Sequence, residues 1–208
     1  DRYREHDIEM MIADLGSHQV DVFNWFLRAA PTSVVARGGL DYYDDGREWY
    51  DSVMAIYEFD TDPGPVRAFY QVLNTTSFGS YYETFMGDRG TINISEDPSK
   101  GFYVPEPTKK PPEWVNEADR VEKLGASAIK LIGESRAEAE RKKEKMEPEV
   151  KKAIHQLHLE NFFDAIRKAT AVSCPPEVGY ETAVTVLRVN EAVESGRPLE
   201  FRPGDFAV

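Results

Sequence analysis

The feature that most constrains the fold is a block of strand-forming runs between residues 32 and 104. The runs are rich in Val, Ile, Tyr, Phe and Thr, which favour strands. Turn sequences between them, Asp44-Asp45-Gly46, Asp62-Pro63-Gly64 and Asp88-Arg89-Gly90, have the composition of hairpin connections. Connections this short cannot hold a crossover helix, so the pattern predicts a large, mostly antiparallel sheet. The runs are TSVVARGGLDYY, YDSVMAIYEFD, VRAFYQVLNTT, YYETFMGD and TINISE.

Helical patterns flank the strand block. Residues 10–29 carry an apolar stripe that stops before Pro31. Residues 154–169 place seven residues on one helical face: Ile154, Leu157, Asn161, Phe162, Ala165, Ile166 and Ala169. Residues 180–194 predict another helix, with Gly196 just past its end. Its buried side is predicted to consist mainly of Ala183, Val186, Leu187, Asn190 and Val193.

The order of helix, strands and helices predicts an α+β domain, an open-faced sheet with helices packed on one face. The other sheet face then needs a partner. Alternate strand positions offer an apolar surface for one, at Phe69, Leu73, Tyr82 and Met86. An exposed face of this kind predicts contact with a second domain or a second subunit, so we expect a homo-oligomer through the sheet.

Residues 105–153 differ in composition from the rest. The segment PEPTKKPPEW cannot hold regular structure, because its prolines fix φ and remove donors. The segment ESRAEAERKKEKMEPEVKK nearly balances acids and bases at helical spacing. We interpret it as a solvated helix rather than a binding tract.

Charge and composition exclude several classes of function. The net charge is −12, from 25 Lys and Arg against 37 Asp and Glu, which disfavours binding to nucleic acid or anionic membranes. No apolar run is long enough to span a bilayer. The single cysteine, Cys174, excludes an internal disulfide and a Cys-based zinc site. The chain also lacks a Gly-x-Gly-x-x-Gly or Gly-Lys-Ser/Thr motif, so we expect no dinucleotide site within it.

One group of residues has the composition of a chemical site. Asp14, His18, Asp21 and Trp25 are spaced so that they share one face of a helix that is otherwise largely apolar. A carboxylate one turn from a histidine favours the imidazolium and orients the ring, as a proton-transfer residue requires. Two alternatives stay open: Asp14 as a helix N-cap with a structural His18, or Asp14 and His18 as metal ligands without a third ligand at a recognised spacing.

Other candidates are weaker. His155 and His158 are three residues apart, but a pair is not a site, and the position of His158 near the apolar stripe favours a core histidine. Cys174 has no basic neighbour in sequence that would lower its pKa, so a nucleophilic role is not expected.

Four short segments, spread over nearly the whole chain, occur in an order found in one known family. They are Asp14-x-Gly16-x-His18-x-x-Asp21 with Asn24-Trp25-Phe26-Leu27, Glu83-x-x-x-Gly87-Asp88-Arg89-Gly90, Asn161-Phe162-Phe163-Asp164-Ala165-Ile166, and Asn190-Glu191-Ala192 with Gly196. Together they resemble the second domain of the glucose–fructose oxidoreductase/inositol dehydrogenase (Gfo/Idh/MocA) family. Two departures stand out: Asp88 replaces the family's usual Thr, and Met10 to Ala13 replace the Gly-Gly that often precedes the Asp.

The resemblance implies that residues 1–208 form a C-terminal substrate-binding and oligomerisation domain. Its N-terminal partner, a Rossmann domain binding NAD or NADP, is expected to lie outside this chain, which begins at Asp1 without an initiator Met. In the family, the Asp and His of this motif reach the substrate beside the nicotinamide, and a lysine of the Rossmann half completes the site. The implied catalytic residues are therefore Asp14 and His18, with Trp25 as a further substrate contact.

The implied activity is that of an NAD(P)-dependent oxidoreductase acting on a sugar, polyol or related hydroxy compound, with this chain inactive alone. No metal is expected, and the cytoplasm is the expected location. Two alternatives remain from other classes: a non-catalytic scaffold of the same fold, and a metal-assisted sugar lyase or isomerase.

Overall fold

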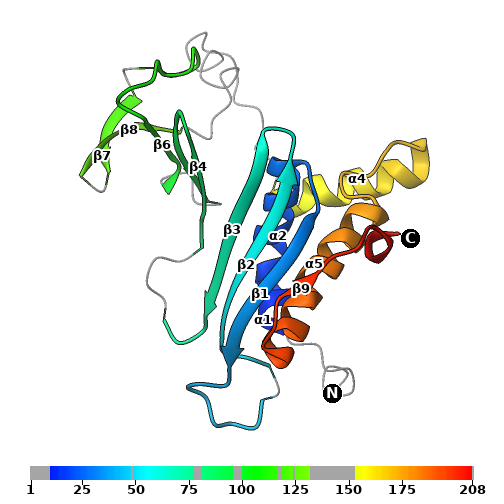
Figure 1. Cartoon of the computed structure of the whole chain (residues 1–208). Coiled ribbons are helices and arrows are strands. Elements are labelled where there is room, and N and C mark those ends of the chain that lie inside the picture. Colours follow the sequence, from blue (N-terminus) through cyan, green and yellow to red (C-terminus); the bar gives the residue numbers. More distant parts are fainter. Residues whose placement is uncertain are drawn as a thin grey trace. The chain divides into compact units, whose positions relative to one another are not determined.

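The structure is a computed structural model of the chain, and it describes residues 10–47, 49–76, 81–95, 100–116, 119–123, 125–131 and 153–207. These residues divide into two compact units. The first combines residues 1–78 with 158–208, and the second spans residues 79–157. We describe each unit by itself (Figure 1).

The first unit is built on a four-stranded antiparallel sheet in the order β3-β2-β1-β9. Its strands are β1 (Pro31–Gly39), β2 (Ser52–Thr61), β3 (Gly64–Leu73) and β9 (Leu199–Glu200). The tight turn between Thr61 and Gly64 joins β2 to β3, as predicted from Asp62-Pro63-Gly64. The longer loop between β1 and β2 contains the predicted turn Asp44-Asp45-Gly46.

Strand β2 alternates strictly between buried and exposed side chains, and the middle parts of β1 and β3 do the same. In β2, Val53, Ala55, Tyr57 and Phe59 are at most 1% exposed, whereas Met54 and Ile56 are each 42% exposed. Such alternation buries one face of the sheet and leaves the other to solvent. The buried face forms the core of the unit.

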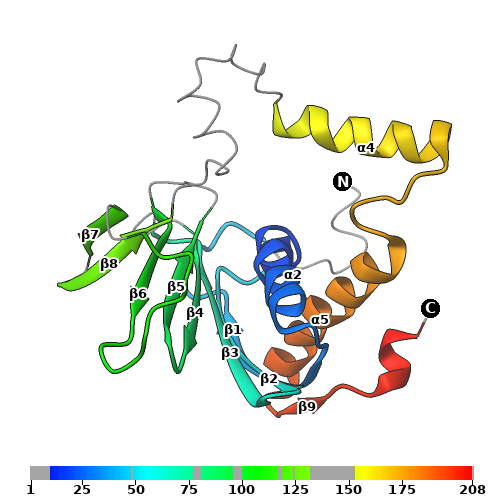
Figure 2. The same ribbon diagram turned by 90° about the horizontal axis from the view of Figure 1, so that it is seen from above.

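Helices α1 (Met10–Ala13), α2 (Leu15–Leu27) and α5 (Pro176–Ser195) belong to this unit. Figures 1 and 2 show α2 and α5 on the same face of the sheet. Both α1 and α2 contact α5, and α5 contacts β1. The predicted helix over residues 10–29 is interrupted at Asp14, which separates α1 from α2. Helix α2 ends at Leu27, and its C-cap residue Arg28 has a left-handed φ of 53°.

The buried side of α5 differs from the prediction. Val186 and Asn190 are buried as expected, but Ala183 is exposed and Leu187 is 46% exposed. Thr182 and Thr185 are buried in their place. Thr185 Oγ1 donates to the Glu181 carbonyl at 2.8 Å, which satisfies the hydroxyl inside its own helix. The predicted C-terminal stop is confirmed, because Gly196 caps α5 with a φ of 64°.

Helix α4 (Ile154–Lys168) is amphipathic, but its apolar side is exposed. Leu157, Phe162 and Ile166 are 53%, 50% and 66% exposed. His158 is exposed as well, so the prediction of a core histidine was wrong. Asn161 instead organises the following loop: its Oδ1 accepts from the Ser173 amide at 2.8 Å, and its Nδ2 donates to the Ala171 carbonyl at 3.2 Å.

The second unit contains a five-stranded antiparallel sheet in the order β4-β5-β6-β8-β7. Its strands are β4 (Glu83–Gly87), β5 (Gly90–Ile94), β6 (Phe102–Pro105), β7 (Arg120–Lys123) and β8 (Ala126–Lys130). Gly87 pairs with Gly90 across the predicted Asp88-Arg89 turn. The Tyr103 ring occupies the space that a Cβ at Gly90 would need, and its hydroxyl donates to the Arg89 carbonyl at 2.8 Å.

The predicted α+β class with antiparallel strands is confirmed. The described strands fall into two sheets, because β3 pairs only with β2 and β4 pairs only with β5 among them. The β7–β8 hairpin was not predicted within the proline-rich and charged region. The predicted solvated helix over residues 134–152 lies outside the described residues. None of the described helices is long and apolar enough to cross a membrane.

Candidate functional site

Helix α2 has a buried side and an outward side, and the buried side fixes which residues point outward. Gly16, Val20, Phe23 and Asn24 are buried. At Gly16 the helix passes so close to β3 that an added Cβ would lie 2.8 Å from the Tyr70 hydroxyl oxygen. A larger residue would force the Tyr70 side chain or the helix to shift, so the glycine of the Asp14-x-Gly16-x-His18 motif favours this packing.

The outward side carries the polar residues that the sequence singled out. Asp14 and His18 are both exposed, and no hydrogen bond or ion pair joins their side chains. Asp14 occupies the N-cap position of α2 without a side-chain capping bond, although its carbonyl accepts from Ser17 Oγ at 2.6 Å. The N-cap interpretation is therefore confirmed in position only, because the Asp14 carboxylate makes neither a capping hydrogen bond nor the expected bond with His18.

Large apolar side chains share the outward side with these polar residues. Trp25 is 72% exposed, Leu15 53% and Phe26 42%. The Trp25 and Phe26 rings meet edge to face, with centroids 5.1 Å apart and planes at 88°. Exposed aromatic rings on the same helix as an exposed acid and imidazole are typical of a surface that meets a ligand or another domain.

Asp21, the second acid of the motif, is only partly exposed, and its carboxylate is directed toward α5. Its Oδ1 accepts from Thr182 Oγ1 at 2.8 Å. The neighbouring Glu181 is partly buried, and burial followed by the negative charge of Asp21 raises the pKa of its carboxyl. Sequence reasoning missed Thr182 and Glu181, because they are about 160 residues from Asp21 and no local pattern marks them.

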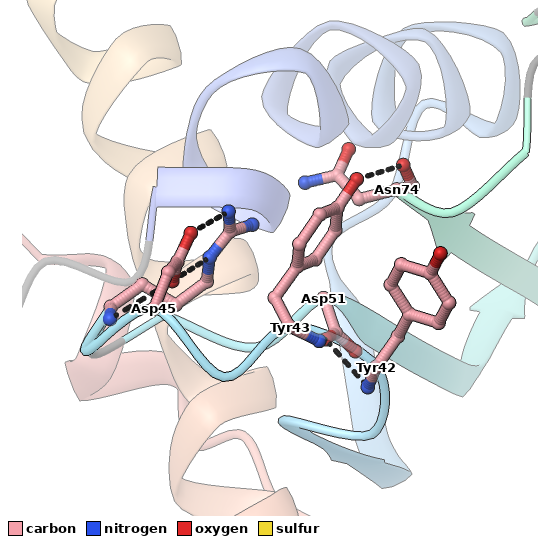
Figure 3. Close-up of polar contacts among 6 residues, drawn as sticks. Tyr42, Tyr43, Asp45, Asp51 and Asn74 are labelled. Atoms are coloured by element: carbon pink, nitrogen blue, oxygen red, sulfur yellow. Dashed lines mark hydrogen bonds and ion pairs between the residues drawn. The ribbon is translucent and has the colours of Figure 1, made fainter.

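A second polar cluster lies in the loop between β1 and β2 (Figure 3). The Asp51 side chain accepts from the backbone amides of Asp41, Tyr42 and Tyr43 at 3.0, 3.0 and 2.9 Å. Asp51 is only 1% exposed, and these donors, Tyr43 first, hold the pKa of its carboxyl below the ordinary value. A carboxylate that is satisfied by its own loop stabilises that loop.

An arginine completes this loop. Arg47 Nε donates to Asp45 Oδ1 at 2.8 Å, and this bond lowers the pKa of Asp45 to about 2. The guanidinium lies 3.8 Å from the Tyr43 ring centroid and 5.5 Å from that of Trp49. Each charged group therefore already has an internal partner, and the cluster is structural.

The remaining sequence candidates are not brought together into a site. His155, His158 and Cys174 are all exposed. Among the described residues, no three His, Cys, Asp or Glu side chains are grouped as a metal ion would require. The outward side of α2, with Asp14, His18 and Trp25, is the candidate site.

Comparisons with known proteins agree with the geometry at the level of fold. The structure is similar to an NAD-binding protein from Listeria innocua, with 20% identity, a TM-score of 0.60, and coverage of 94% of this chain and 49% of that one. It is also similar to aldose–aldose oxidoreductase from Caulobacter crescentus complexed with glycerol, with 12% identity, a TM-score of 0.59, and coverage of 91% and 47%.

A third similar structure is the WlbA dehydrogenase from Bordetella pertussis in complex with NADH and UDP-GlcNAcA. It shows 14% identity, a TM-score of 0.55, and coverage of 92% of this chain and 45% of that one. The chain thus spans about half the length of these structural relatives. A comparison with curated protein sequences found no match.

A family model described as "Oxidoreductase family, C-terminal alpha/beta domain" matches residues 2–201, nearly the whole chain. The match confirms the resemblance stated from the sequence motifs. The chain belongs to the Gfo/Idh/MocA oxidoreductase family, in which it corresponds to the C-terminal alpha/beta domain.

Proposed function

We propose that this chain is the substrate-binding and catalytic half of an NAD(P)-dependent oxidoreductase acting on a sugar, a polyol or a related hydroxy compound. The observation that supports it most is the outward side of α2. There the Asp14 carboxylate and the His18 imidazole are exposed one helical turn apart without a hydrogen bond between them, and the exposed Trp25 indole lies two turns further along the same helix. Polar groups of this kind can bind sugar hydroxyls, and an aromatic ring can pack on the apolar face of a sugar.

The reaction proposed is the oxidation of a secondary alcohol to a ketone. The carbon–hydrogen bond breaks as hydride leaves, and the hydroxyl proton goes to the His18 imidazole, which returns it to water. His18 acts as general base in this direction and as general acid in reduction. Asp14, one helical turn earlier, binds a neighbouring hydroxyl or stabilises the imidazolium. When bound, the nicotinamide supplies the hydride acceptor.

The residues of this chain fit the substrate side of that reaction and not the dinucleotide side. The sequence has no glycine-rich turn between a strand and a helix to hold a pyrophosphate. We therefore assign NAD or NADP binding to an N-terminal Rossmann half. The apolar side of α4, including Leu157, Phe162 and Ile166, is a surface on which such a half could pack. The structural relatives are about twice as long as this chain, which supports this assignment.

The exposed face of the four-stranded sheet supports the homo-oligomer in the same proposal. Val35, Ile56 and Phe69 are paired side by side across β1, β2 and β3, and they are 37%, 42% and 57% exposed. Contiguous apolar residues on a sheet face favour a self-complementary contact. Phe69→Glu places a charge there and should turn an oligomer into a monomer in sedimentation velocity; an unchanged sedimentation coefficient would argue against this interface.

The proposed function is tested by cofactor binding and turnover. NADH and NADPH are titrated, by fluorescence, into the full-length protein and into residues 1–208. The full-length protein then receives myo-inositol, glucose and xylose with NAD⁺ or NADP⁺, and reduction is followed by absorbance. We expect binding only to the full-length protein, and turnover with a hydroxylated substrate. Absence of binding by the full-length protein would contradict an oxidoreductase and favour a scaffold of the same fold.

A further inference from the structure

The contact between α2 and α5 determines which partner the Asp21 carboxylate takes. Asp21 follows His18 by three residues, and side chains at this spacing on a helix are neighbours. An exposed imidazole and a carboxylate in this position could form an ion pair. The structure instead has Asp21 Oδ1 accepting from Thr182 Oγ1 at 2.8 Å.

The Thr182 hydroxyl is well placed to hold that carboxylate. Thr182 is 7% exposed, whereas His18 is exposed, so the hydrogen bond to Asp21 is shielded from water on the α5 side. A hydroxyl bonded to an ionised carboxylate forms a charge-assisted bond, which is stronger than one between neutral groups. Among the described residues, His18 has no hydrogen bond or ion pair.

We propose that Thr182 is a positioning residue for the α2 site: its hydroxyl holds the Asp21 carboxylate on α5 and so leaves the His18 imidazole unpaired for a substrate hydroxyl. The inference rests on the proposed function for its meaning, since an unpaired base matters only if His18 transfers a proton. It assigns a role to a residue outside the motif, on a helix at the other end of the chain.

Two carboxyl groups flank His18 on its own helix, and a third lies beside one of them on α5. Asp14 lies one turn before it and Asp21 one turn after it on α2. From α5, the partly buried Glu181 interacts with Asp21, whose negative charge contributes to the raised pKa of Glu181. From β3, the Tyr70 hydroxyl lies against α2 at Gly16. Of these groups, Asp21 is the one whose direction depends on Thr182.

The test is an NMR titration of the histidine Cε1 protons in this chain, with His18 assigned from His18→Ala. Thr182→Val keeps the side-chain shape but removes the donor, so Asp21 can turn to His18 and stabilise the imidazolium. The titration midpoint of His18 should then rise by a few tenths of a pH unit, the size of an exposed ion pair on a helix. Thr182→Ser keeps the hydroxyl and should titrate like the unmodified chain.

The double variant Asp21→Asn/Thr182→Val isolates the carboxylate and should lose the rise. The inference is overturned if Thr182→Val titrates like the unmodified chain, if Thr182→Ser shows the same rise, or if the double variant keeps it. Should Thr182→Val not fold, Thr182→Ala removes the same donor. Because no substrate or cofactor is present, a negative titration is distinct from a failure of the proposed function, which turnover decides.

Discussion

The outward side of α2 and the loop between β1 and β2 contain similar types of residue, but the polar side chains of the two regions differ in exposure and in hydrogen bonding. Both regions contain carboxylates and aromatic side chains. In the loop, Asp51 is 1% exposed and accepts three backbone amides, and Arg47 pairs with Asp45 beside the Tyr43 ring. On α2, Asp14 and His18 are exposed and are not bonded to each other.

The difference separates a structural cluster from a candidate site. A polar group that is satisfied within the protein stabilises the fold, and it has little left to offer a ligand. A polar group on a rigid helix that is left to solvent is available for binding and proton transfer. Substitutions in the loop should therefore change stability, whereas substitutions on the outward side of α2 should change activity.

The largest expected effect is on turnover. His18→Ala in the full-length protein should lower the turnover number by about 10²- to 10⁴-fold, because the substitution removes the proposed general base and general acid–base catalysis typically contributes a factor of this size. The melting temperature and the affinity for NADH should stay close to those of the unmodified protein, since His18 is exposed. His155→Ala, at another exposed histidine, is the matched control and should leave turnover unchanged. A large drop in melting temperature for His18→Ala would make this residue structural.

The next effect is on the packing that orients α2. Gly16→Ala should destabilise the fold by about 1–3 kcal/mol, because the new Cβ has to displace the Tyr70 hydroxyl or the helix. Gly179→Ala is the control in α5, where an added Cβ meets nothing within 4 Å. That substitution should be neutral or stabilise by up to about 1 kcal/mol. Chemical denaturation measures both, and equal effects would contradict the close approach at Gly16.

A smaller effect is expected in the loop, and its pH dependence has a defined sign. Backbone donors lower the pKa of Asp51 in the folded state, so its contribution to stability is present above the ordinary aspartate pKa of about 4. The contribution is lost as the pH falls through the lowered folded value. Asp51→Asn should therefore reduce the melting temperature at pH 7, and the deficit should shrink in acid. The exposed Asp44→Asn should show no deficit, and a deficit that grows in acid would contradict the assignment.

The smallest effect is at the end of α4. Ala169 adopts a left-handed φ of 51°, which favours glycine over residues with a Cβ. Ala169→Gly should stabilise the fold by about 1 kcal/mol or less. Ala183→Gly, at an exposed position inside α5, should destabilise by about 0.5–1 kcal/mol. Thermal melts of the two variants should therefore shift in opposite directions, and shifts of the same sign would count against the left-handed cap.

The parts of the fold that follow local rules could be predicted from the sequence. Strand composition and the turns at Asp62-Pro63-Gly64 and Gly87–Gly90 identify antiparallel hairpins, and Gly196 marks the end of α5. The buried side of α5 could not be predicted, because burial along this helix does not follow hydrophobicity. The chain buries Thr185, whose hydroxyl bonds to the helix backbone, and exposes Leu187.

The candidate site was predictable only in part, for a related reason. The spacing of Asp14, His18 and Trp25 places them on one side of a helix, and the structure leaves all three exposed. The hydrogen bond between Asp21 and Thr182 joins distant segments and depends on how α5 packs. The β7–β8 hairpin was missed because its strands carry few apolar residues and no strict alternation.

The most direct test of the central claim is a structure of the full-length protein with NAD⁺ and a bound polyol substrate. We expect an imidazole nitrogen of His18 to lie about 2.6–3.2 Å from the hydroxyl oxygen on the carbon that loses hydride. Asp14 should contact the same substrate or the His18 ring. A productively bound substrate whose reacting hydroxyl is far from His18, with the imidazole facing solvent, would show that His18 is not the general base.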